Sequence, residues 1–281
     1  MFKTALFGKP LQRKHSAEMH NAAFKAASVD ACYELHEVDE SQLTRYAREA
    51  RNGDWLGFQI TAPHKQFVMD LLDEVEPAAQ RIGAVNSVAV TPEGKLVGFN
   101  TDALGFIAGL RSVLARLDGI SAVVAGSGGV GHAATYGLAA SGVGRITVLD
   151  LNIAMPQRLA ASMSDVADIE PMDFDDTAVR NRLETADLFV NATSVGMLSP
   201  GPVIDVNLLA PHTSVFDVVY IPAQTELVRQ ALGRGLRAAN GDTMLVAQAA
   251  AAWMRWTGLP DPSETMRAAV APLLRETDQR P

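Results

Sequence analysis

The sequence predicts an α/β protein with two domains, and three observations support this prediction. Strand-like and helix-like segments alternate along most of the chain, a pattern typical of parallel sheets covered by helices on both faces. A second unit, with a glycine-rich turn between a strand and a helix, begins beyond residues 101–104. The length of 281 residues is enough for one large domain or two modest ones.

The alternation can be followed from the N-terminus. The strand-like segments are KTALFG, CYELHEV, WLGFQIT, SAVVAG, RITVLDL, DLFVNAT and SVFDVVY. The helix-like stretches between most of them are SAEMHNAAFKAASV, SQLTRYAREARN, HKQFVMDLLDEV, ALGFIAGLRSVLARL and TELVRQALGRG. Residues 85–99 differ, because two strand-like runs flank the turn-forming PEGK, which predicts a hairpin. Two helices, within 241–256 and 262–276, end the chain, and their periodicity does not decide which domain they cover.

Composition excludes several classes of protein. With 48% hydrophobic and 20% charged residues, the chain suits a packed soluble globule. Because no apolar run reaches the roughly 18 residues of a membrane span, and the N-terminus lacks signal-peptide features, we expect a cytoplasmic protein without membrane association. The single cysteine, Cys32, excludes an internal disulfide and suits a reducing compartment. A net charge of −8 opposes binding to nucleic acid.

The strongest local signal is the glycine-rich turn after the strand that ends at Ala125. Glycines here let the backbone turn tightly and approach a pyrophosphate, whose charge meets the N-terminus of the following helix. The spacing fits G-x-G-x-x-G in a strand–turn–helix–strand context. We therefore expect a doubly wound dinucleotide-binding domain; the alternative is a tight turn without a ligand. The expected cofactor-binding residues of the turn are Gly126, Ser127, Gly128, Gly129, Val130 and Gly131.

Asp150, at the end of the next strand, bears on the choice of cofactor. A carboxylate at this place accepts hydrogen bonds from the adenosine ribose of NAD and repels the 2′-phosphate of NADP. NAD is therefore preferred over NADP, although Arg158 lies a turn or two into the next helix and is a candidate partner for that phosphate. Capping of the next helix by Asp150 is an alternative that can hold alongside ribose binding.

Polar clusters also follow several strands, where open α/β sheets bind ligands. Each has a plain alternative: Asn100 and Asp102 as turn former and helix cap, Lys65 as a solvated helix lysine, and Asn86 as the start of a hairpin strand. The clusters occupy residues 59–65, 84–86, 99–102, 191–197, 218–225 and 240–248.

Taken in order, these motifs resemble the shikimate/quinate dehydrogenase family over nearly the whole chain. They read GKPLQRKHSAEMHN, ITAPHK, GAVN, GFNTDALGF, GSGGVG, NATSVGM, DVVYIPAQTELV and NGDTMLVAQAAAAW. The resemblance implies an NAD(P)-dependent oxidoreductase that transfers hydride at ring C3 of shikimate, 3-dehydroshikimate or a close relative. It also implies a substrate domain of residues 1–103, completed by 241–281, and a Rossmann-type domain of residues 104–240.

The resemblance also assigns roles to residues by position. It makes Lys65 and Asp102 the catalytic pair, which agrees with the chemistry, because an ammonium group stabilises a developing alkoxide and donates a proton. The substrate, a cyclic polyol carboxylate, is expected to contact Thr61, Asn86, Tyr220 and Gln248. The positions expected to line the nicotinamide half of the cofactor are Asn191, Ala192, Thr193, Gly241 and Met244.

This chain departs from the family where the substrate carboxylate is expected to bind. Of the two usual hydroxyls, the second is Ser16, but the first is replaced by Lys14, and Gln59 stands where the family usually has asparagine. Lys14 can serve a carboxylate through its charge; the alternatives are a solvated Lys14 and an N-cap role for Ser16. No His, Cys or carboxylate cluster has metal-ligand spacing, so no metal is expected.

Three other assignments remain open at this stage. Quinate and modified shikimates are alternative substrates, since they differ near the carboxylate that Lys14 is expected to meet. A catalytically idle sensor of the same metabolites is a non-enzymatic alternative, which the presence of both Lys65 and Asp102 disfavours. The expected assembly is a monomer or a homodimer.

Overall fold

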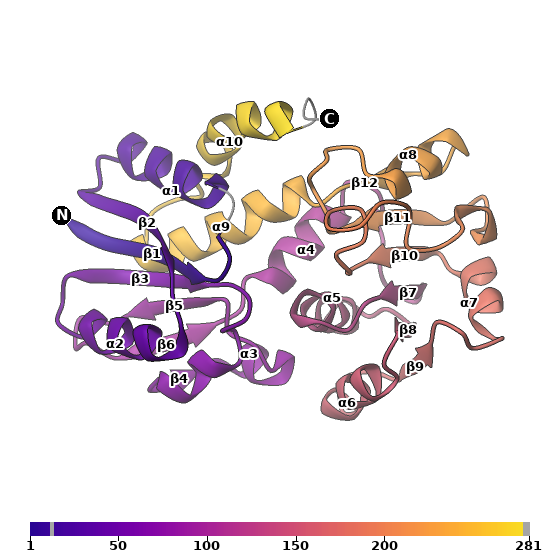
Figure 1. The fold of residues 1–281 in the computed structure, drawn as a ribbon, viewed down its shortest axis with the longest axis horizontal. Coiled ribbons are helices and arrows are strands. Elements are labelled where there is room, and N and C mark those ends of the chain that lie inside the picture. Colours follow the sequence, from indigo (N-terminus) through magenta and orange to yellow (C-terminus); the bar gives the residue numbers. More distant parts are fainter. Residues whose placement is uncertain (12–13, 278–281) are drawn as a thin grey trace. The chain divides into compact units, whose positions relative to one another are not determined.

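The computed structural model describes residues 1–11 and 14–277, which form two compact units (Figure 1). Unit 1 contains Met1–Thr101 and Val246–Leu273, and unit 2 contains Asp102–Leu245 together with the chain from Leu274 onward. Both units are α/β, so the predicted fold class is confirmed. The division of function between a substrate domain and a dinucleotide-binding domain stays a prediction.

Unit 1 is built on a mixed sheet of six strands in the order β2-β1-β3-β5-β6-β4. The strands are β1 (Phe2–Gly8), β2 (Ala31–Glu37), β3 (Trp55–Ile60), β4 (Glu74–Val75), β5 (Ser87–Val90) and β6 (Leu96–Phe99). β1 pairs in parallel with β2 and β3, whereas β5 is antiparallel to both β3 and β6. The hairpin predicted around PEGK is therefore confirmed, because β5 and β6 are its two strands.

Helices cover both faces of this sheet, as side-chain alternation along a strand requires. The helices that contain residues of unit 1 are α1 (His15–Ala26), α2 (Glu40–Ala50), the 3₁₀ helix η1 (Phe67–Leu71), α3 (Pro77–Ile82), α9 (Asp242–Thr257) and α10 (Ser263–Thr277). Alternate residues of β1, Ala5 and Phe7, enter a core with Leu43 and Ala47 of α2.

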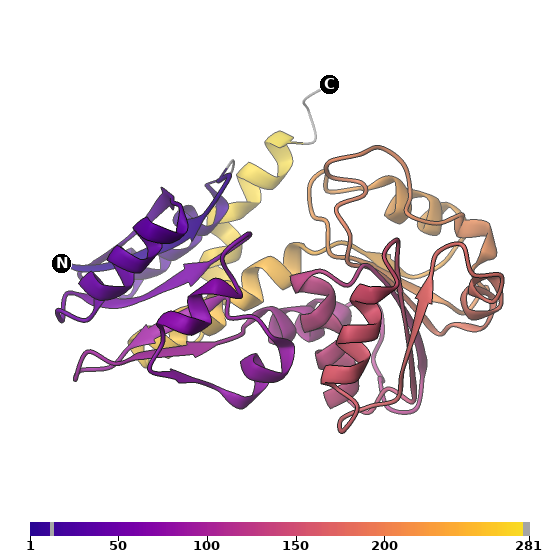
Figure 2. The same cartoon turned by 60° about the horizontal axis from the view of Figure 1, so that its bottom comes forward.

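The opposite face carries the C-terminal helices, in agreement with the expectation from the family resemblance (Figure 2). The Trp256 indole Nε1 donates to the Val88 carbonyl oxygen at 2.9 Å, and the rings of Phe24 and Trp253 lie 6.1 Å apart. A Cβ at Gly57 would come within 2.2 Å of Trp256 Nε1. Glycine in β3 thus allows α9 to approach the sheet closely.

The helix predicted over residues 64–75 is wrong, because the segment forms a turn, η1 and then the short strand β4. Hydrogen bonds to the sheet override the local helical period: the Asp73 amide donates to the Leu96 carbonyl at 3.0 Å, and the Asp73 carboxylate accepts from the Leu96 amide at 2.7 Å. The helix predicted over 103–117 also ends early, at Leu110.

Unit 2 is a doubly wound parallel sheet in the order β12-β11-β10-β7-β8-β9. Its strands are β7 (Ser121–Ala125), β8 (Arg145–Asp150), β9 (Ile169–Asp173), β10 (Leu188–Asn191), β11 (Ser214–Asp217) and β12 (Ala238–Ala239). The strand order reverses between β7 and β10, which is the ligand-binding switch point of a Rossmann-type fold.

Two hydrophobic cores lie on the two faces of this sheet. The helices of the unit are α4 (Asp102–Leu110), α5 (Gly129–Ala140), α6 (Ala154–Ser162), α7 (Val179–Thr185), the 3₁₀ helix η2 (Val206–Leu208) and α8 (Glu226–Gly233). One core holds Phe106 of α4 and Leu138 of α5, and the other holds Leu183 of α7 and Leu227 of α8. This two-sided covering confirms the alternation predicted from the sequence.

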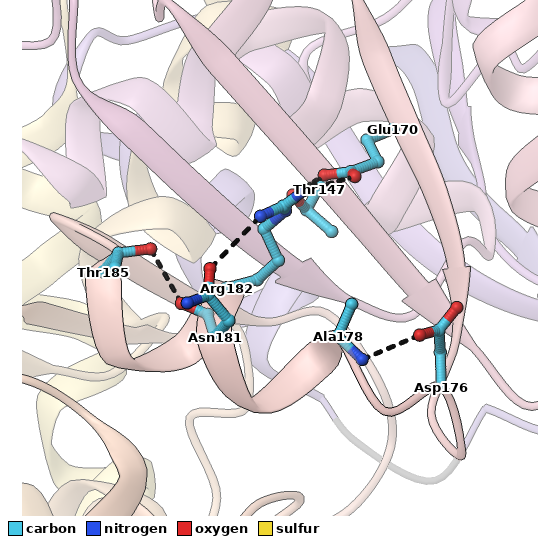
Figure 3. Close-up of polar contacts among 7 residues, drawn as sticks. All are labelled: Thr147, Glu170, Asp176, Ala178, Asn181, Arg182 and Thr185. Atoms are coloured by element: carbon cyan, nitrogen blue, oxygen red, sulfur yellow. Dashed lines mark hydrogen bonds and ion pairs between the residues drawn. The ribbon is translucent and has the colours of Figure 1, made fainter.

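The strand β9 and the helix α7, which the sequence analysis did not predict, are joined by an ion pair (Figure 3). Arg182 donates to both carboxylate oxygens of Glu170, at 2.6 and 2.7 Å, and Thr147 of β8 donates to Glu170 at 3.0 Å. The hydrogen bond from Arg182 holds the pKa of Glu170 below its usual range. A bidentate pair of this kind fixes α7 against the edge of the sheet.

Candidate active site

The glycine-rich turn of unit 2 connects β7 to α5 at the switch point. Gly126 has φ of +98°, and a Cβ at Gly131 would come within 2.1 Å of the Gly126 carbonyl oxygen. Gly128 is exposed at the N-cap position of α5, and a Cβ there would meet no described atom within 4 Å. The turn is thus packed on its inner side and leaves space in front of the helix N-terminus, as a bound phosphate requires.

Asp150 stands at the end of β8 and faces this turn. Its carboxylate accepts from the Ser127 amide at 2.9 Å and from the Ser127 hydroxyl at 2.5 Å. Burial opposes ionisation, but the hydrogen bonds from Ser127 outweigh it and hold the pKa of Asp150 below its usual range. A negative charge is therefore fixed beside the turn. The alternative N-cap role for Asp150 is wrong, because Ile153 occupies that position of α6.

Asp217, at the end of β11, ties together the loops that follow β10 and β11. It is fully buried and accepts from Asn191 Nδ2 at 2.9 Å, the Val219 amide at 3.0 Å and the Thr225 hydroxyl at 2.6 Å. Burial raises the pKa of Asp217 to about 6, although these donors partly offset it. Asp217 was not predicted as a site residue from the sequence, although it opens the DVVYIPAQT motif.

The predicted nicotinamide-lining residues are placed by this arrangement. The Thr193 amide and hydroxyl donate to Asn191 Oδ1 at 3.0 and 2.7 Å, and the Ala192 amide donates to the Ala125 carbonyl at 2.7 Å. A Cβ at Gly241 would lie 2.2 Å from the Val218 carbonyl oxygen. The carboxyl edge of the sheet therefore gathers this set, with half-buried Tyr220 and buried Met244 in the loop after β11 and in α9.

In unit 1, side-chain hydrogen bonds link residues predicted to bind the polyol. Asn86 Nδ2 donates to Thr101 Oγ1 at 3.0 Å, and Thr101 Oγ1 lies 3.5 Å from Gln248 Oε1. Gln248 Oε1 also accepts from Gln59 Nε2 at 2.9 Å, and Tyr33 donates to Gln59 Oε1 at 2.7 Å. We call the set Asn86, Thr101, Gln248, Gln59 and Tyr33 the polar chain. Tyr33 and Thr101 were not predicted as site residues from the sequence.

Lys65 lies in the turn after β3, half-buried, so its alternative as a solvated helix lysine is wrong. The turn is held on both sides: the Thr61 amide donates to the Phe7 carbonyl at 2.9 Å, and the Val85 amide donates to the Lys65 carbonyl at 2.9 Å. The His64 ring Nε2 lies 2.8 Å from the Val38 carbonyl oxygen. Asp102, 7% exposed, is the first residue of α4 and belongs to unit 2. The catalytic pairing of Lys65 with Asp102 stays a prediction.

The two residues predicted to meet the substrate carboxylate open α1. Lys14 occupies the N-cap position and is exposed; with the described part of the chain its side chain makes no capping hydrogen bond. Ser16 is half-buried in the first turn of the helix, so the alternative N-cap role for Ser16 is wrong. Among residues 1–11 and 14–277, no group of three His, Cys, Asp or Glu side chains is placed to hold a metal ion. None of the described helices is long and apolar enough to span a bilayer.

Unit 2 is of the Rossmann type, with a glycine-rich turn and with Asp150 at the end of its second strand, β8. Unit 1 of the same chain is rich in buried polar side chains. Together these features define an NAD(P)-dependent oxidoreductase. The chain is 38% identical over 270 residues to the shikimate dehydrogenase (NADP(+)) of Symbiobacterium thermophilum. The alignment covers 94% of this chain and 92% of that relative. The chain therefore belongs to the shikimate/quinate dehydrogenase family.

Further comparisons agree with this assignment. Residues 6–88 match the family model described as the shikimate dehydrogenase substrate binding domain. The quinate dehydrogenase of Corynebacterium glutamicum in complex with NAD superposes with a TM-score of 0.89 at 33% identity, covering 96% of this chain and 99% of that one. The 5-ketofructose reductase of Gluconobacter sp. strain CHM43 gives a TM-score of 0.85 at 31% identity, covering 97% and 98%.

Proposed function

We propose that this protein catalyses the reversible NAD(P)-dependent oxidoreduction of shikimate, quinate or a close relative at ring carbon C3. The main support is the polar chain of unit 1, in which Asn86 and Gln248, two expected polyol ligands, share the Thr101 hydroxyl as a partner. Amide and hydroxyl groups that are buried or half-buried and already held by hydrogen bonds suit the recognition of several ring hydroxyls.

In the proposed reaction the cofactor, Lys65 and Asp102 have different roles. The glycine-rich turn of unit 2 would hold the dinucleotide, whose nicotinamide would supply or accept the hydride. The Lys65 ammonium stabilises the negative charge that develops on the substrate oxygen and donates a proton to it in the reducing direction. Asp102 accepts a hydrogen bond from the neighbouring ring hydroxyl.

NAD is the proposed cofactor of preference. The fixed charge of Asp150 suits hydroxyls of the adenosine ribose and repels a 2′-phosphate. Arg158, which was considered above as a partner for the 2′-phosphate of NADP, is exposed in α6.

Lys14 bears on the substrate. An exposed cation at the N-cap of α1 suits a carboxylate, since the helix N-terminus also favours anions. Quinate differs from shikimate at the carbon that bears this group, so Lys14 is proposed to contribute to the choice between them. A cytoplasmic location, and a monomer or homodimer, complete the proposal.

A steady-state assay with shikimate and quinate, each with NAD and NADP, tests the function. We expect turnover with at least one acid and a higher kcat/KM with NAD. Lys65→Met should lower kcat by a factor of roughly 10²–10⁴ while the protein still binds the dinucleotide. Activity with 5-ketofructose alone would refute the proposed substrate, and binding of the acids without turnover would indicate a sensor.

A further inference from the structure

Gln59 is the buried centre of the polar chain, and it is the position at which the T-x-P motif departs from the family pattern. Its side chain is 3% exposed. Gln59 Oε1 lies 2.7 Å from the Tyr33 hydroxyl and 3.1 Å from His20 Nε2. Gln59 Nε2 lies 2.9 Å from Gln248 Oε1. One end of the Gln59 amide therefore meets a hydroxyl and an imidazole, and the other end meets a second amide.

The protonation of the neighbours fixes which end of Gln59 is which. His20 is fully buried, and burial lowers its pKa to about 3, so the ring is neutral at physiological pH. The ring stacks on Tyr33 with centroids 4.3 Å apart and planes inclined by 5°. The other ring nitrogen of His20, Nδ1, is buried and has no hydrogen-bond partner in the described structure, so we assign the single ring proton to Nε2, where Gln59 can accept it. With this proton and the Tyr33 hydroxyl proton both directed at it, the facing atom of Gln59 is the carbonyl oxygen.

The consequence is transmitted to Gln248. An amide carbonyl that accepts two hydrogen bonds has used both lone pairs, so Gln59 meets Gln248 with its NH₂ group, which can only donate. Gln248 must then present its own carbonyl oxygen to Gln59, where the Thr101 hydroxyl also lies. The NH₂ group of Gln248 is consequently turned away from Gln59.

We propose that Gln59 is a positioning residue that fixes the orientation of the Gln248 amide, so that Gln248 acts on the substrate as a hydrogen-bond donor. The substrate group that meets Gln248 is then an acceptor, such as a ring hydroxyl whose proton is donated elsewhere. This inference rests on the proposed function for the identity of the ligand, but the orientation itself is a property of unit 1.

The length of the side chain matters for this role. Asparagine, the usual residue of the family at this position, is shorter by one C–C bond, about 1.5 Å. From the backbone of β3 it would not reach Tyr33 and Gln248 together, since both contacts are below 3 Å. The hydrogen-bonded connection from Tyr33 of β2 through residue 59 to Gln248 of α9 therefore requires glutamine at position 59.

Two amide-to-acid variants test the polarity. In Gln59→Glu the carboxylate still accepts from Tyr33 and His20 but has no N–H for Gln248, so Gln248 must reverse and turn its oxygen outward. In Gln248→Glu the outward group is an oxygen without any reversal. We expect both variants to raise KM by roughly three- to tenfold, the value of one hydrogen bond, with a smaller effect on kcat.

A pH series separates positioning from simple structural damage. Burial raises the pKa of an introduced carboxyl group, and below that pKa the carboxyl O–H of the Gln59→Glu variant can donate to Gln248 as the wild-type amide does. The KM defect of Gln59→Glu should therefore shrink as the pH falls. The matched control is Gln80→Glu, the same chemical change at an exposed residue of α3, an element that contributes no residue to the polar chain. It should leave KM unchanged.

A wild-type KM in Gln59→Glu over the whole pH series would overturn the proposal, as would an equal defect in Gln80→Glu. If Gln59→Glu does not fold, Gln59→Met keeps the length without donor or acceptor; it should raise KM with no recovery at low pH, and an unchanged KM again overturns the role. Absence of turnover in the wild type would refute the proposed function only. The orientation is then tested in ligand-free protein by neutron diffraction, which locates amide deuterons: those of Gln59 should point at the Gln248 carbonyl oxygen. Deuterons of Gln248 pointing at Gln59 would overturn the inference.

Discussion

The buried carboxylate of Asp217 predicts an unusual dependence of stability on pH. Its pKa is about 6 in the folded protein, against 3.8 for an ordinary aspartate. Because the folded pKa is the higher one, the folded protein binds more protons than the unfolded chain between these values. The stabilising contribution is fully present below about pH 4 and is lost as the pH rises through about 6.

The size of the effect follows from the shift. A difference of about two pKa units corresponds to about 3 kcal/mol, at about 1.4 kcal/mol per unit. Asp217→Asn removes the titration but keeps the shape of the side chain and an oxygen for Asn191 and Val219. The free energy of unfolding of the wild type minus that of the variant should therefore fall by about 2.5 kcal/mol between pH 4 and pH 7, because an aspartate of the unfolded chain is already more than half ionised at pH 4.

The assay must report on unit 2. All three tryptophans (Trp55, Trp253 and Trp256) lie in unit 1, so their fluorescence follows the wrong unit. Hydrogen exchange of peptides from β10 and β11 gives the local free energy of opening at each pH, and the Asp217 carboxyl ¹³C shift gives its pKa directly. A difference between the two proteins that is flat across pH 4–7, or a titration midpoint near 4, would refute the electrostatic reasoning.

Three further outcomes are expected. Asp150→Asn should raise the ratio of kcat/KM with NADP to that with NAD by about tenfold or more, because the repelling charge is gone; an unchanged ratio argues against the role of Asp150 in cofactor choice. In Gly131→Ala the new methyl group would lie 2.1 Å from a carbonyl oxygen of the same turn. The variant should lose about 1–3 kcal/mol of stability and bind the dinucleotide more weakly in a fluorescence titration. In the control, Gly233→Ala, the new methyl group meets no described atom within 4 Å, so stability and binding should both be unchanged. Trp256→Phe leaves the Val88 carbonyl without its indole donor and should cost at least about 1–3 kcal/mol in urea unfolding of unit 1; a loss below about 0.5 kcal/mol, on the order of a surface change, would contradict this contact.

The sequence predicted the elements whose signals are local. The hairpin around PEGK and the glycine turn each combine a turn former with flanking apolar runs, so their structure depends little on distant residues. β9 carries Pro171 at the edge of its sheet, and β12 has only two residues. Such segments become strands because a neighbouring strand pairs with them, which no local pattern records.

The candidate site shows the same limit more clearly. Asn86 and Gln248 were assigned through the family resemblance, but the group that joins Gln248 to the rest of unit 1 is Gln59, which lies 189 residues away in sequence. Tyr33 and Asp217 sit in strand-like runs, where a polar residue reads as an ordinary member of the strand. Their roles follow from burial and from partners on other elements, and neither is visible in one segment of sequence.

Because unit 1 is made of two segments that are far apart in the sequence, its parts leave the ribosome at different times. Met1–Thr101 leaves the ribosome before Val246–Leu273 is made, and this later segment supplies Trp253, Trp256 and Gln248. Since domains fold as units, the early segment emerges with its α9-facing side uncovered and with Gln59 lacking a partner from α9. Asp102–Leu245 of unit 2 is also made before that partner exists. Met1–Thr101 therefore precedes this part of unit 2 in synthesis but can complete its native packing only after it.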